Sequence, residues 1–412
     1  MIDLIKKIGR AYRDVNLMVR ILIGLILGVA LGLTVPGITA ITILGKLFVG
    51  ALKAIAPVLV ALLVAASIAK AREGLGKRFR TVIVLYMSST LIAAIVAVLA
   101  SRMFPIHLIL PEANVEEAAP SELADVFMKL ATDLMSNPVT AISSASYLSI
   151  LFWAIIMGFA LKRCASEKTV NVIHDLSESV SLVVHWVIHC APFGILGLVY
   201  ASVAESGLEI FTTYGKLVAL LVACMLTTSL IINPIISSVM LKRNAYPLLW
   251  KCLKGSAVSA FFTRSSAANI PVNMTLCKRL GLNEDFYSVS IPLGCTINMD
   301  GAAVTITVMT LATCTTLGID VSLGSALVLS VLAAFAACGA SGVAGGSLLL
   351  IPMAASLFGI SQDISMQVVA IGFIISVIQD SVETALNSSG DVMFTATADY
   401  YDRQQEGEVI TL

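Results

Sequence analysis

Two tracts of small residues interrupt otherwise apolar sequence: residues 255–272 read GSAVSAFFTRSSAANIPV, and residues 336–352 read AACGASGVAGGSLLLIP. Glycine is costly inside a helix, and the prolines near the ends of the tracts, Pro271 and Pro352, break one. A break at membrane depth leaves backbone groups unsatisfied unless they are buried in protein or line a wet cavity. Close helix packing through small residues is the common alternative. Because each tract precedes a long helix that carries Asn and Asp, we favour two re-entrant hairpins.

The two hairpins belong to a repeat. A predicted hairpin followed by a predicted helix occurs over residues 246–315 and again over residues 322–395. The count of spans makes the first hairpin enter from the cytoplasm and the second from outside. Paired interrupted segments of opposite topology are the best sequence indication of a transporter's binding site. The sequence therefore predicts inverted repeats around a site.

The composition requires a membrane. Of the 412 residues, 58% are hydrophobic and only 13% are charged, and the mean hydropathy is +0.94. A soluble domain carries about 25% charged residues, and one this apolar would aggregate, so a soluble enzyme is excluded. Lys plus Arg and Asp plus Glu both number 26, and this balance excludes nucleic acid as a partner. The eight cysteines are scattered and form neither a disulfide framework nor a zinc pattern.

Eight apolar stretches are long enough to cross a bilayer, at about 20 residues a span. They are residues 17–35, 43–69, 81–101, 145–162, 171–202, 214–241, 286–315 and 364–395. Residues 103–140 are rich in proline and glutamate, so we expect an external loop there. No small-residue cleavage site follows the basic amino end, and we expect the first stretch to be a retained helix instead of a signal peptide.

The charged loops orient these spans. Basic residues follow the second, fourth and sixth spans, and acidic residues fill the intervening loops. Because Lys and Arg mark the cytoplasmic side of a membrane, we expect both termini to be cytoplasmic. The sequence therefore predicts an all-α, multi-pass protein of the cell inner membrane, with eight transmembrane helices and two re-entrant hairpins.

Polar residues concentrate in the seventh and eighth spans. The seventh contains residues 294–301, GCTINMDG, and the eighth contains residues 380–391, DSVETALNSSGD. Five polar side chains of the eighth span follow helical spacing and form one stripe: Asp380, Glu383, Thr384, Asn387 and Asp391. A surface helix with a solvated face would show the same stripe. Residues 368–378 are almost wholly apolar, however, so we expect this helix to be embedded and its stripe to face a site.

Buried carboxylates need cations. One ionised carboxylate at a helix centre costs about 2.5–3.5 kcal/mol on insertion scales. Arg264 is the only strongly basic residue in either small-residue tract, and it neutralises about one carboxylate. Oxygen-rich surroundings suit hard monovalent cations, which leaves sodium or protons. Spans seven and eight contain no His that would relay protons, so sodium ranks first.

Two other classes of membrane protein fit less well. An intramembrane aspartyl protease shares a proton between paired acids, but it needs Gly-x-Gly-Asp and Tyr-Asp at membrane depth. Here Asp391 follows Ser-Ser-Gly, and Tyr401 and Asp402 lie in the polar tail. An ion channel needs a repeated filter or a pore ring, and nothing in the sequence resembles one. We therefore predict a secondary active transporter and no enzyme.

Three motifs resemble the dicarboxylate/amino acid:cation symporters, the glutamate transporter family. Residues 263–272, TRSSAANIPV, resemble the tip of that family's first hairpin, and residues 298–301, NMDG, match its span-seven motif. Residues 380–391 resemble its span-eight ligand helix. The resemblance covers nearly the whole chain, and within the family it is greatest to the bacterial sodium-coupled serine/threonine symporters. It implies a homotrimer and an elevator-type movement of a transport domain against a trimerising scaffold.

The resemblance divides the chain between these two parts. Residues 1–78, with the first two spans, and residues 103–205, with the external loop and the fourth and fifth spans, would form the scaffold. Residues 79–102, the third span, would belong to the transport domain. Residues 206–412, with the sixth to eighth spans and both hairpins, would complete it.

The resemblance also implies substrate-binding residues on the hairpin tips and the eighth span: Ser265, Ser266, Gly342, Val343, Asp380, Glu383, Thr384 and Asn387. Asp380 would bind the substrate's ammonium group, with Thr384 assisting, and would form a structural ion pair with Arg264. Asn387 and the first hairpin tip would hold the α-carboxylate. The second-hairpin loop, residues 342–345, would be the gate.

The sodium ligands that the resemblance implies lie on the third, seventh and eighth spans: Tyr86, Ser89, Thr90, Gly294, Thr296, Asn298, Asp300, Asn387 and Asp391. One ion would use Asp391, and a second would use Asp300. A third would rest on backbone oxygens around Thr296 and residues 337–340.

Two departures from the family's pattern bear on the substrate. Acidic-substrate members have Arg where this chain has Glu383 and Thr where it has Ala302, and both normally read the side-chain carboxylate. An anionic residue there repels glutamate or aspartate, whereas it accepts a hydrogen bond from a hydroxyl. We therefore predict sodium-coupled uptake of small neutral amino acids, with serine and threonine first. In one alternative, Glu383 pairs with a cationic substrate or with a cation of the protein itself. In another, uptake is coupled to protons or the substrate is acidic.

Overall fold

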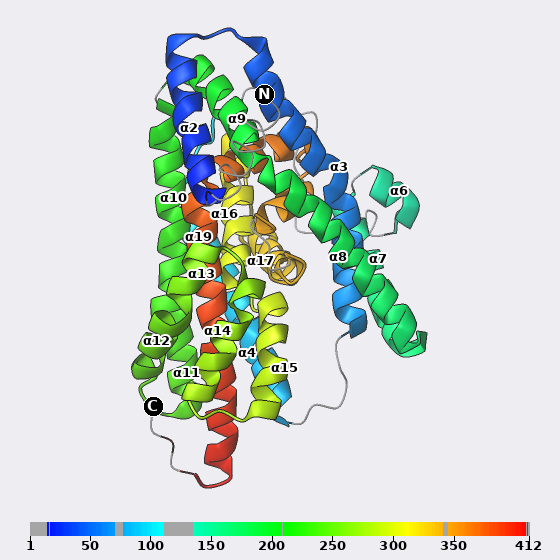
Figure 1. Cartoon of the computed structure of the whole chain (residues 1–412), viewed down its shortest axis with the longest axis vertical. Helices are drawn as coiled ribbons and strands as arrows, with labels where there is room; N and C mark the ends of the chain where they lie inside the picture. The colour runs from blue at the N-terminus through cyan, green and yellow to red at the C-terminus, as the bar shows by residue number, and fades with distance from the viewer. Residues whose placement is uncertain are drawn as a thin grey trace, which may run out of the picture.

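Every regular element in the described part of the chain is a helix (Figure 1). The computed structural model describes residues 15, 17–70, 77–110, 135–144, 146–207, 209–340, 345–408 and 410. The all-α expectation is confirmed for these residues. Of the expected external loop, residues 111–134 lie outside the described residues, which resume just before the short helix α6 (Pro138–Ser143).

Five helical stretches of the described residues are long and apolar enough to cross a membrane. They are α3 (Thr39–Lys70), α4 (Lys77–Met103), Thr212–Leu241, Glu284–Thr316 and α19 (Gln362–Gln405). A bent pair of helices raises this number to six when it is counted as one span. Two helices of 18 residues, α2 (Leu17–Thr34) and α7 (Tyr147–Cys164), lie where the sequence predicts the first and fourth spans.

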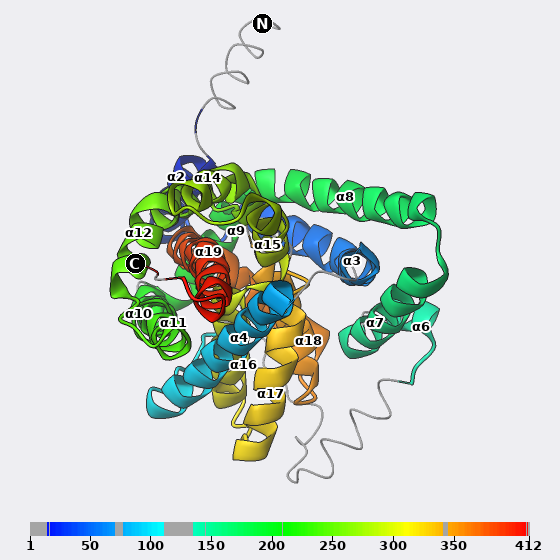
Figure 2. The ribbon, with the colours of Figure 1, turned by 90° about the horizontal axis from the view of Figure 1, so that it is seen from below.

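The fifth predicted span consists of two helices in the structure. The sequence predicts one helix over residues 171–202, whereas the structure has α8 (Glu167–His189) and α9 (Ala191–Ser206), which meet at 52°. Pro192 lies in the first turn of α9. Since proline has no N–H to donate to the preceding turn, continuous helical hydrogen bonding ends there. α8 consequently runs away from the centre of the molecule (Figure 2).

Glycines bring the amino-terminal helices close together. Gly24, Gly28 and Gly32 are four residues apart and therefore share one face of α2. A Cβ on any of them would lie only 2.2–3.0 Å from a carbonyl oxygen of α9. Small residues at this spacing let membrane helices approach backbone to backbone. α2, α3, α7, α8 and α9 pack mainly on one another. In Figure 1, α2 and α9 lie at the top of the molecule, and α3, α7 and α8 run down its right-hand side.

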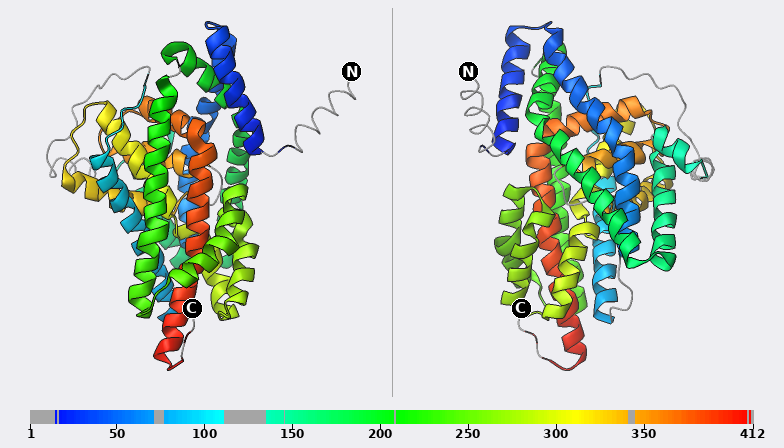
Figure 3. Two further views of the ribbon diagram at one scale, coloured as in Figure 1. Left: turned by 90° about the vertical axis from the view of Figure 1, so that its left-hand side faces the viewer. Right: turned by 45° about the vertical axis from the view of Figure 1, so that its right-hand side comes forward.

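The long helix α19 runs through the rest of the molecule (Figure 3). It packs against α4, and against helices formed by residues 209–356: α10 (Glu209–Thr227), α11 (Asn233–Leu241), α13 (Val258–Thr263), α14 (Ser266–Arg279), α15 (Glu284–Ile297), α16 (Asp300–Thr316) and α18 (Ile351–Ser356). Most of its side chains between Ile364 and Tyr400 are buried. The predicted polar stripe is therefore enclosed by protein.

The first small-residue tract forms a hairpin, which we call hairpin 1 (246–279). Its first arm consists of α12 (Tyr246–Cys252), a π-helical turn η2 (Leu253–Ala257) and α13, and its second arm is α14. Arg264 at the tip has φ 52°, in the left-handed region, and ends α13. Ser256 of the first arm donates to Asn273 of the second at 2.5 Å, so the arms run back along each other.

The second small-residue tract also separates two arms, which we call hairpin 2 (323–356). They are α17 (Leu323–Ala337) on one side, and a short 3-10 turn η3 (Ser347–Leu350) with α18 on the other. Gly342 and Val343, the predicted gate residues, lie outside the described residues. Pro352 lies in the first turn of α18, where its missing N–H is tolerated.

Candidate cation and substrate sites

The polar residues of the seventh and eighth spans meet at a break between α15 and α16. Asn298 (φ −93°, ψ 77°) and Met299 (φ −117°, ψ 51°) leave the helical region, and Asp300 begins the next helix. α4 and α19 both pack against α16. Unwound backbone between half-helices is where membrane transporters coordinate ions. The break is therefore a candidate cation site.

Asp300 is fully buried and accepts hydrogen bonds from three residues on two other helices. Its Oδ1 accepts from Ser89 Oγ at 2.8 Å and from Thr90 Oγ1 at 3.0 Å, both on α4. Its Oδ2 accepts from Asn233 Nδ2 on α11 at 2.9 Å. Ser89 Oγ also lies 3.3 Å from Asn298 Oδ1. All these partners are neutral, and no cation of the described residues forms an ion pair with Asp300.

Asp391 is the second buried carboxylate, and Asn298 connects it to the break. Asn298 Nδ2 donates to Asp391 Oδ1 at 3.0 Å and to the Asn387 carbonyl at 3.2 Å. The Tyr86 hydroxyl lies 3.2 Å from the Asp391 backbone oxygen. A Cβ at Gly294 would sit 2.8 Å from Asp391 Oδ1. Glycine at this position therefore lets the carboxylate reach the backbone of α15.

The chemistry of these two groups fits sodium. Asp391 Oδ2 and Asn233 Oδ1 are both buried without a hydrogen-bond partner. An unpartnered buried acceptor costs about 1–3 kcal/mol, a cost that a coordinated cation removes. The available ligands are carboxylate, amide, hydroxyl and backbone oxygens, which hard cations prefer. The described residues contain no cluster of three or more His, Cys, Asp and Glu side chains that would suit a transition metal.

The third predicted ion position joins the break to hairpin 2. The sulfur of Cys338 lies 3.8 Å from the Ile297 carbonyl oxygen, so residues 337–340 reach the end of α15. Thr296 Oγ1 donates to the Leu293 carbonyl at 2.7 Å. Its hydroxyl is thus engaged within its own helix, which is consistent with a site built from backbone oxygens.

Asp380 joins both hairpins to α19. Arg264 Nε, at the tip of hairpin 1, donates to Asp380 Oδ2 at 2.7 Å, and both side chains are buried. The Gly345 N–H, from the loop of hairpin 2, donates to Asp380 Oδ1 at 3.2 Å. Gly345 has φ 75°, a conformation that glycine adopts without strain. In such a buried pair each charge compensates the other, and loss of either leaves a charge uncompensated.

Glu383 lies one turn further along α19 among neutral donors. Its Oε2 accepts from Thr305 Oγ1 at 2.7 Å, from Ser347 Oγ at 2.9 Å and from Gln379 Nε2 at 2.5 Å. Within the described ranges no protein cation pairs with Glu383. This geometry favours a carboxylate that is oriented by hydrogen bonds over one that is neutralised by the protein.

The remaining predicted substrate residues lie around this group. Asn387 Oδ1 accepts from the Gly301 N–H at 2.8 Å, at the first turn of α16. Ser265 caps α14 and accepts from the Ala268 N–H at 3.2 Å. The hydroxyls of Ser266 and Thr384 make no hydrogen bond to any residue that the structure describes, although both residues are buried. These two hydroxyls therefore keep their hydrogen-bonding capacity for a ligand.

Sequence reasoning missed the partners of the carboxylates. Asn233 holds Asp300, and Thr305, Ser347 and Gln379 hold Glu383. One signal was available for Gln379, since it precedes Glu383 by four residues and therefore shares its helix face. Asn233 is an amide inside a predicted span, which the polar-residue argument applied to spans seven and eight would also have singled out.

A second set of missed residues fastens hairpin 1 to α19. Asn269 Nδ2 and Asn273 Nδ2 donate to Ser388 Oγ at 2.8 Å and 3.0 Å. Asn273 Nδ2 also donates to the Ser388 carbonyl at 3.0 Å. All three residues are fully buried. Both arms of hairpin 1 thus reach the turn of α19 that carries Asn387, because Ser256 joins the same network.

Gly301 permits α16 and α19 to approach closely enough for these contacts. A Cβ at Gly301 would lie 2.8 Å from the Cα of Glu383. We expect G301A to lower the stability by about 1–3 kcal/mol, because an overpacked core must move apart. The control is G215A on α10, where an added Cβ meets nothing within 4 Å. Thermal unfolding of the purified proteins measures both, and equal midpoints for the two variants would contradict the close approach.

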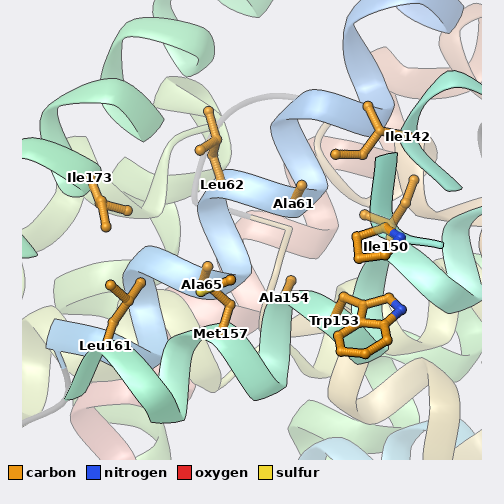
Figure 4. A pocket seen from close by; sticks show the side chains of 11 residues that line it. Ala61, Leu62, Ala65, Ile142, Ile150, Trp153, Ala154, Met157, Leu161 and Ile173 are labelled. Carbon is orange, nitrogen blue, oxygen red and sulfur yellow. The ribbon is translucent and has the colours of Figure 1, made fainter. Parts of the chain in front are cut away.

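A cavity on the other side of the molecule has a different character. It has a volume of about 260 Å³ and is lined by apolar side chains of α3, α6, α7 and α8 (Figure 4). Leu62, Ile150 and Met157 are among them. The ring N–H of Trp153 donates a hydrogen bond to the Ser136 carbonyl at 2.8 Å. A cavity without charged groups does not recognise an amino acid zwitterion, so the candidate site remains at α19.

Membrane-length helices around a buried site lined with oxygen atoms are typical of secondary transporters. Residues 17–401 match the model of the sodium:dicarboxylate symporter family, and this chain belongs to that family. It is therefore a multi-pass membrane transporter and not an enzyme. The family resemblance drawn from the three sequence motifs is confirmed.

Three relatives match this chain over nearly their whole length. A protein of Bifidobacterium adolescentis is 53% identical over 403 residues, which cover 98% of this chain and 94% of the relative. A protein of Streptococcus thermophilus is 53% identical over 395 residues, covering 96% and 98%. A protein of Enterococcus faecalis is 51% identical over 401 residues, covering 97% and 95%. Each of the three is named serine/threonine transporter SstT.

Proposed function

We propose that this protein takes up serine and threonine together with sodium. Relatives named serine/threonine transporter are 51–53% identical over nearly the whole chain, and the family is one of sodium symporters. The observation that carries the substrate class is Glu383, a buried carboxylate that only neutral side chains of the described residues contact. A second carboxylate from the substrate would be repelled there, whereas a hydroxyl would donate to Glu383.

The substrate's charged groups have partners in this arrangement. Asp380 receives the ammonium group beside Arg264, and the unengaged hydroxyl of Thr384 assists. Asn387 and Ser266 hold the α-carboxylate, and the loop of hairpin 2 closes over it. The Arg264–Asp380 distance of 2.7 Å supports a fixed, charge-balanced anchor, and the Gly345–Asp380 hydrogen bond supports contact of hairpin 2 with the bound substrate.

Sodium occupies the oxygen-lined positions beside this anchor. One ion uses Asp391 with the backbone of Gly294, Asn298 and Asn387. The Asp391 Oδ2 atom, which is buried without a hydrogen-bond partner, supports this role. A second uses Asp300 with Asn298 and the α4 residues Tyr86, Ser89 and Thr90. A third uses backbone oxygens near Thr296 and residues 337–340. Bound sodium supplies positive charge that lets the anionic residues and the zwitterion coexist in a buried site.

At the level of the fold, we propose eight spans, two re-entrant hairpins in inverted repeats, and cytoplasmic termini in the cell inner membrane. The scaffold is residues 1–78 and 103–205, and the transport domain is residues 79–102 and 206–412. Preferential packing of α2, α3, α7, α8 and α9 on one another supports this division. The chain functions as a homotrimer in which each transport domain moves like an elevator.

Counterflow in proteoliposomes tests the proposed function. Vesicles loaded with unlabelled serine are expected to accumulate labelled serine or threonine when sodium is present, and much less when choline replaces it. Aspartate, lysine and alanine serve as competing substrates, and a proton gradient without sodium tests the other driving ion. Exchange that is independent of sodium, or stronger competition by aspartate or lysine than by threonine, would contradict the proposal.

We expect the double variant E383R/A302T to turn the preference towards acidic amino acids. The introduced arginine supplies a cation for a substrate carboxylate, and the introduced threonine adds a donor on the facing helix, where Ala302 is fully buried. Competition against labelled serine measures the change, and the ratio of aspartate to serine affinity should rise at least tenfold. The control is E383Q, which removes the negative charge without adding a positive one. It should weaken serine binding without a comparable gain in aspartate binding. An unchanged ratio in the double variant would count against Glu383 as a selectivity residue.

A further inference from the structure

The sixth span contains an irregular turn beside the buried carboxylates. A π-helical turn, η1 (Thr228–Ile232), separates α10 from α11, and Asn233 is the first residue of α11. Its N–H bonds to the Thr228 carbonyl, five residues back. Pro234 follows and has no N–H to donate to that turn. Single π-helical turns inside α-helices are frequent at functional sites, and this one turns Asn233 towards Asp300.

Asn233 has one amide atom in use and one free. It is 2% exposed, and its Nδ2 donates to Asp300 Oδ2 at 2.9 Å. Its Oδ1 is buried without a hydrogen-bond partner. A point beside Gly390, where a Cβ would stand, lies 2.8 Å from Asn298 Nδ2 and 3.8 Å from Asn233 Nδ2. Asn233 therefore lies at the same junction of α11, α16 and α19 as the residues expected to bind sodium.

We propose that Asn233 is a ligand of the sodium ion at Asp300. Its Nδ2 fixes the carboxylate, and its free Oδ1 coordinates the ion. A residue that served only to donate to Asp300 would leave a buried acceptor unsatisfied, whereas a cation next to the carboxylate satisfies it. As a neutral oxygen ligand, Asn233 adds coordination without adding charge, so one sodium still neutralises Asp300. This inference rests on the sodium coupling proposed above.

Two variants of purified full-length protein test this role by the sodium dependence of thermal unfolding, with choline keeping the ionic strength constant. N233L keeps the size but loses both polar atoms, and should raise the half-saturating sodium concentration about tenfold. N233D keeps an oxygen ligand but places two carboxylates together. Its midpoint without sodium should fall and its sodium-induced shift should exceed that of the wild type. N233L should thus weaken the response of the protein to sodium, and N233D should strengthen it. General damage to the fold would not strengthen this response in either variant.

S237A is the matched control. Ser237 lies one turn further along α11, is fully buried, and its Oγ accepts from Thr397 of α19 at 2.9 Å. Loss of the Ser237 hydroxyl removes this buried hydrogen bond between α11 and α19, which lies away from the carboxylates. S237A should lower the midpoint in the absence of sodium and leave the half-saturating sodium concentration within twofold of the wild type.

D300N separates this inference from the proposed function. If D300N responds to sodium like the wild type, the proposed ion at Asp300 is wrong, and Asn233 has no ion to bind. If D300N loses sodium affinity while N233L keeps the wild-type half-saturating concentration, the ion stands and Asn233 is not its ligand. Should N233L fail to fold, N233D decides alone: a sodium-induced shift no larger than that of the wild type overturns the inference.

Discussion

Replacing Asp391 by asparagine is expected to abolish sodium-driven serine uptake while the protein stays folded. Asparagine keeps the shape, and its oxygen can still accept from Asn298, which now lies 3.0 Å from Asp391 Oδ1. The unpartnered Oδ2, however, is replaced by an N–H donor that repels a cation. A unit charge at 4 Å contributes about 4 kcal/mol at an effective dielectric constant of 20, which corresponds to roughly a thousandfold loss of sodium affinity.

Sodium titrations of serine uptake in proteoliposomes, together with sodium-dependent thermal shifts, measure this loss. The control is S389A, two residues earlier on α19, where the buried hydroxyl donates only within its own helix, to carbonyls of the preceding turn such as Ala385 at 2.7 Å. S389A should keep a half-saturating sodium concentration close to that of the wild type. A D391N protein that takes up serine with wild-type sodium dependence would remove Asp391 from the ion site.

The hairpin at residues 246–279 could be predicted because its signals are local. Small residues and a single arginine mark the tract, and the structure places the turn at Arg264, in its middle. The expectation that Pro271 breaks a helix is wrong, because Pro271 lies inside α14. The break at Asn298 was not predicted, because residues 286–315 were expected to form one continuous span. The bend at Cys190 was missed, although Pro192 is a local signal, because the apolar stretch continues through it and hydropathy alone does not register a missing N–H.

The partners of the carboxylates depend on packing that the sequence does not encode locally. Asn233 precedes Asp300 by 67 residues, and their contact requires a particular face of the sixth span to meet α16. The π-helical turn before Asn233 adds one residue to a turn and rotates every later side chain relative to the α-helical period. A reading based on the 3.6-residue period therefore assigns the wrong face to Asn233, and only the three-dimensional structure brings it to the carboxylate.

Removing Arg264 is expected to have the other large effect. R264M leaves the buried Asp380 carboxylate without the guanidinium that now lies 2.7 Å away, and only the Gly345 N–H remains as a described partner. Breaking a buried ion pair from one side costs about 3–5 kcal/mol, whereas removing both charges is far less harmful. R264M should therefore unfold at a markedly lower temperature without substrate, and the double variant R264M/D380N should regain most of the lost stability.

The same pair distinguishes an anchor for the substrate from a purely structural ion pair. If Asp380 receives the ammonium group, serine supplies a positive charge to the unpaired carboxylate of R264M. Serine with sodium should then raise the unfolding temperature of R264M more than that of the wild type, and should not raise that of R264M/D380N. A structural pair predicts no added stabilisation by serine in R264M. Thermal unfolding with and without serine, at constant sodium, decides between the two roles, because only a substrate-binding Asp380 couples the missing guanidinium to the bound ammonium.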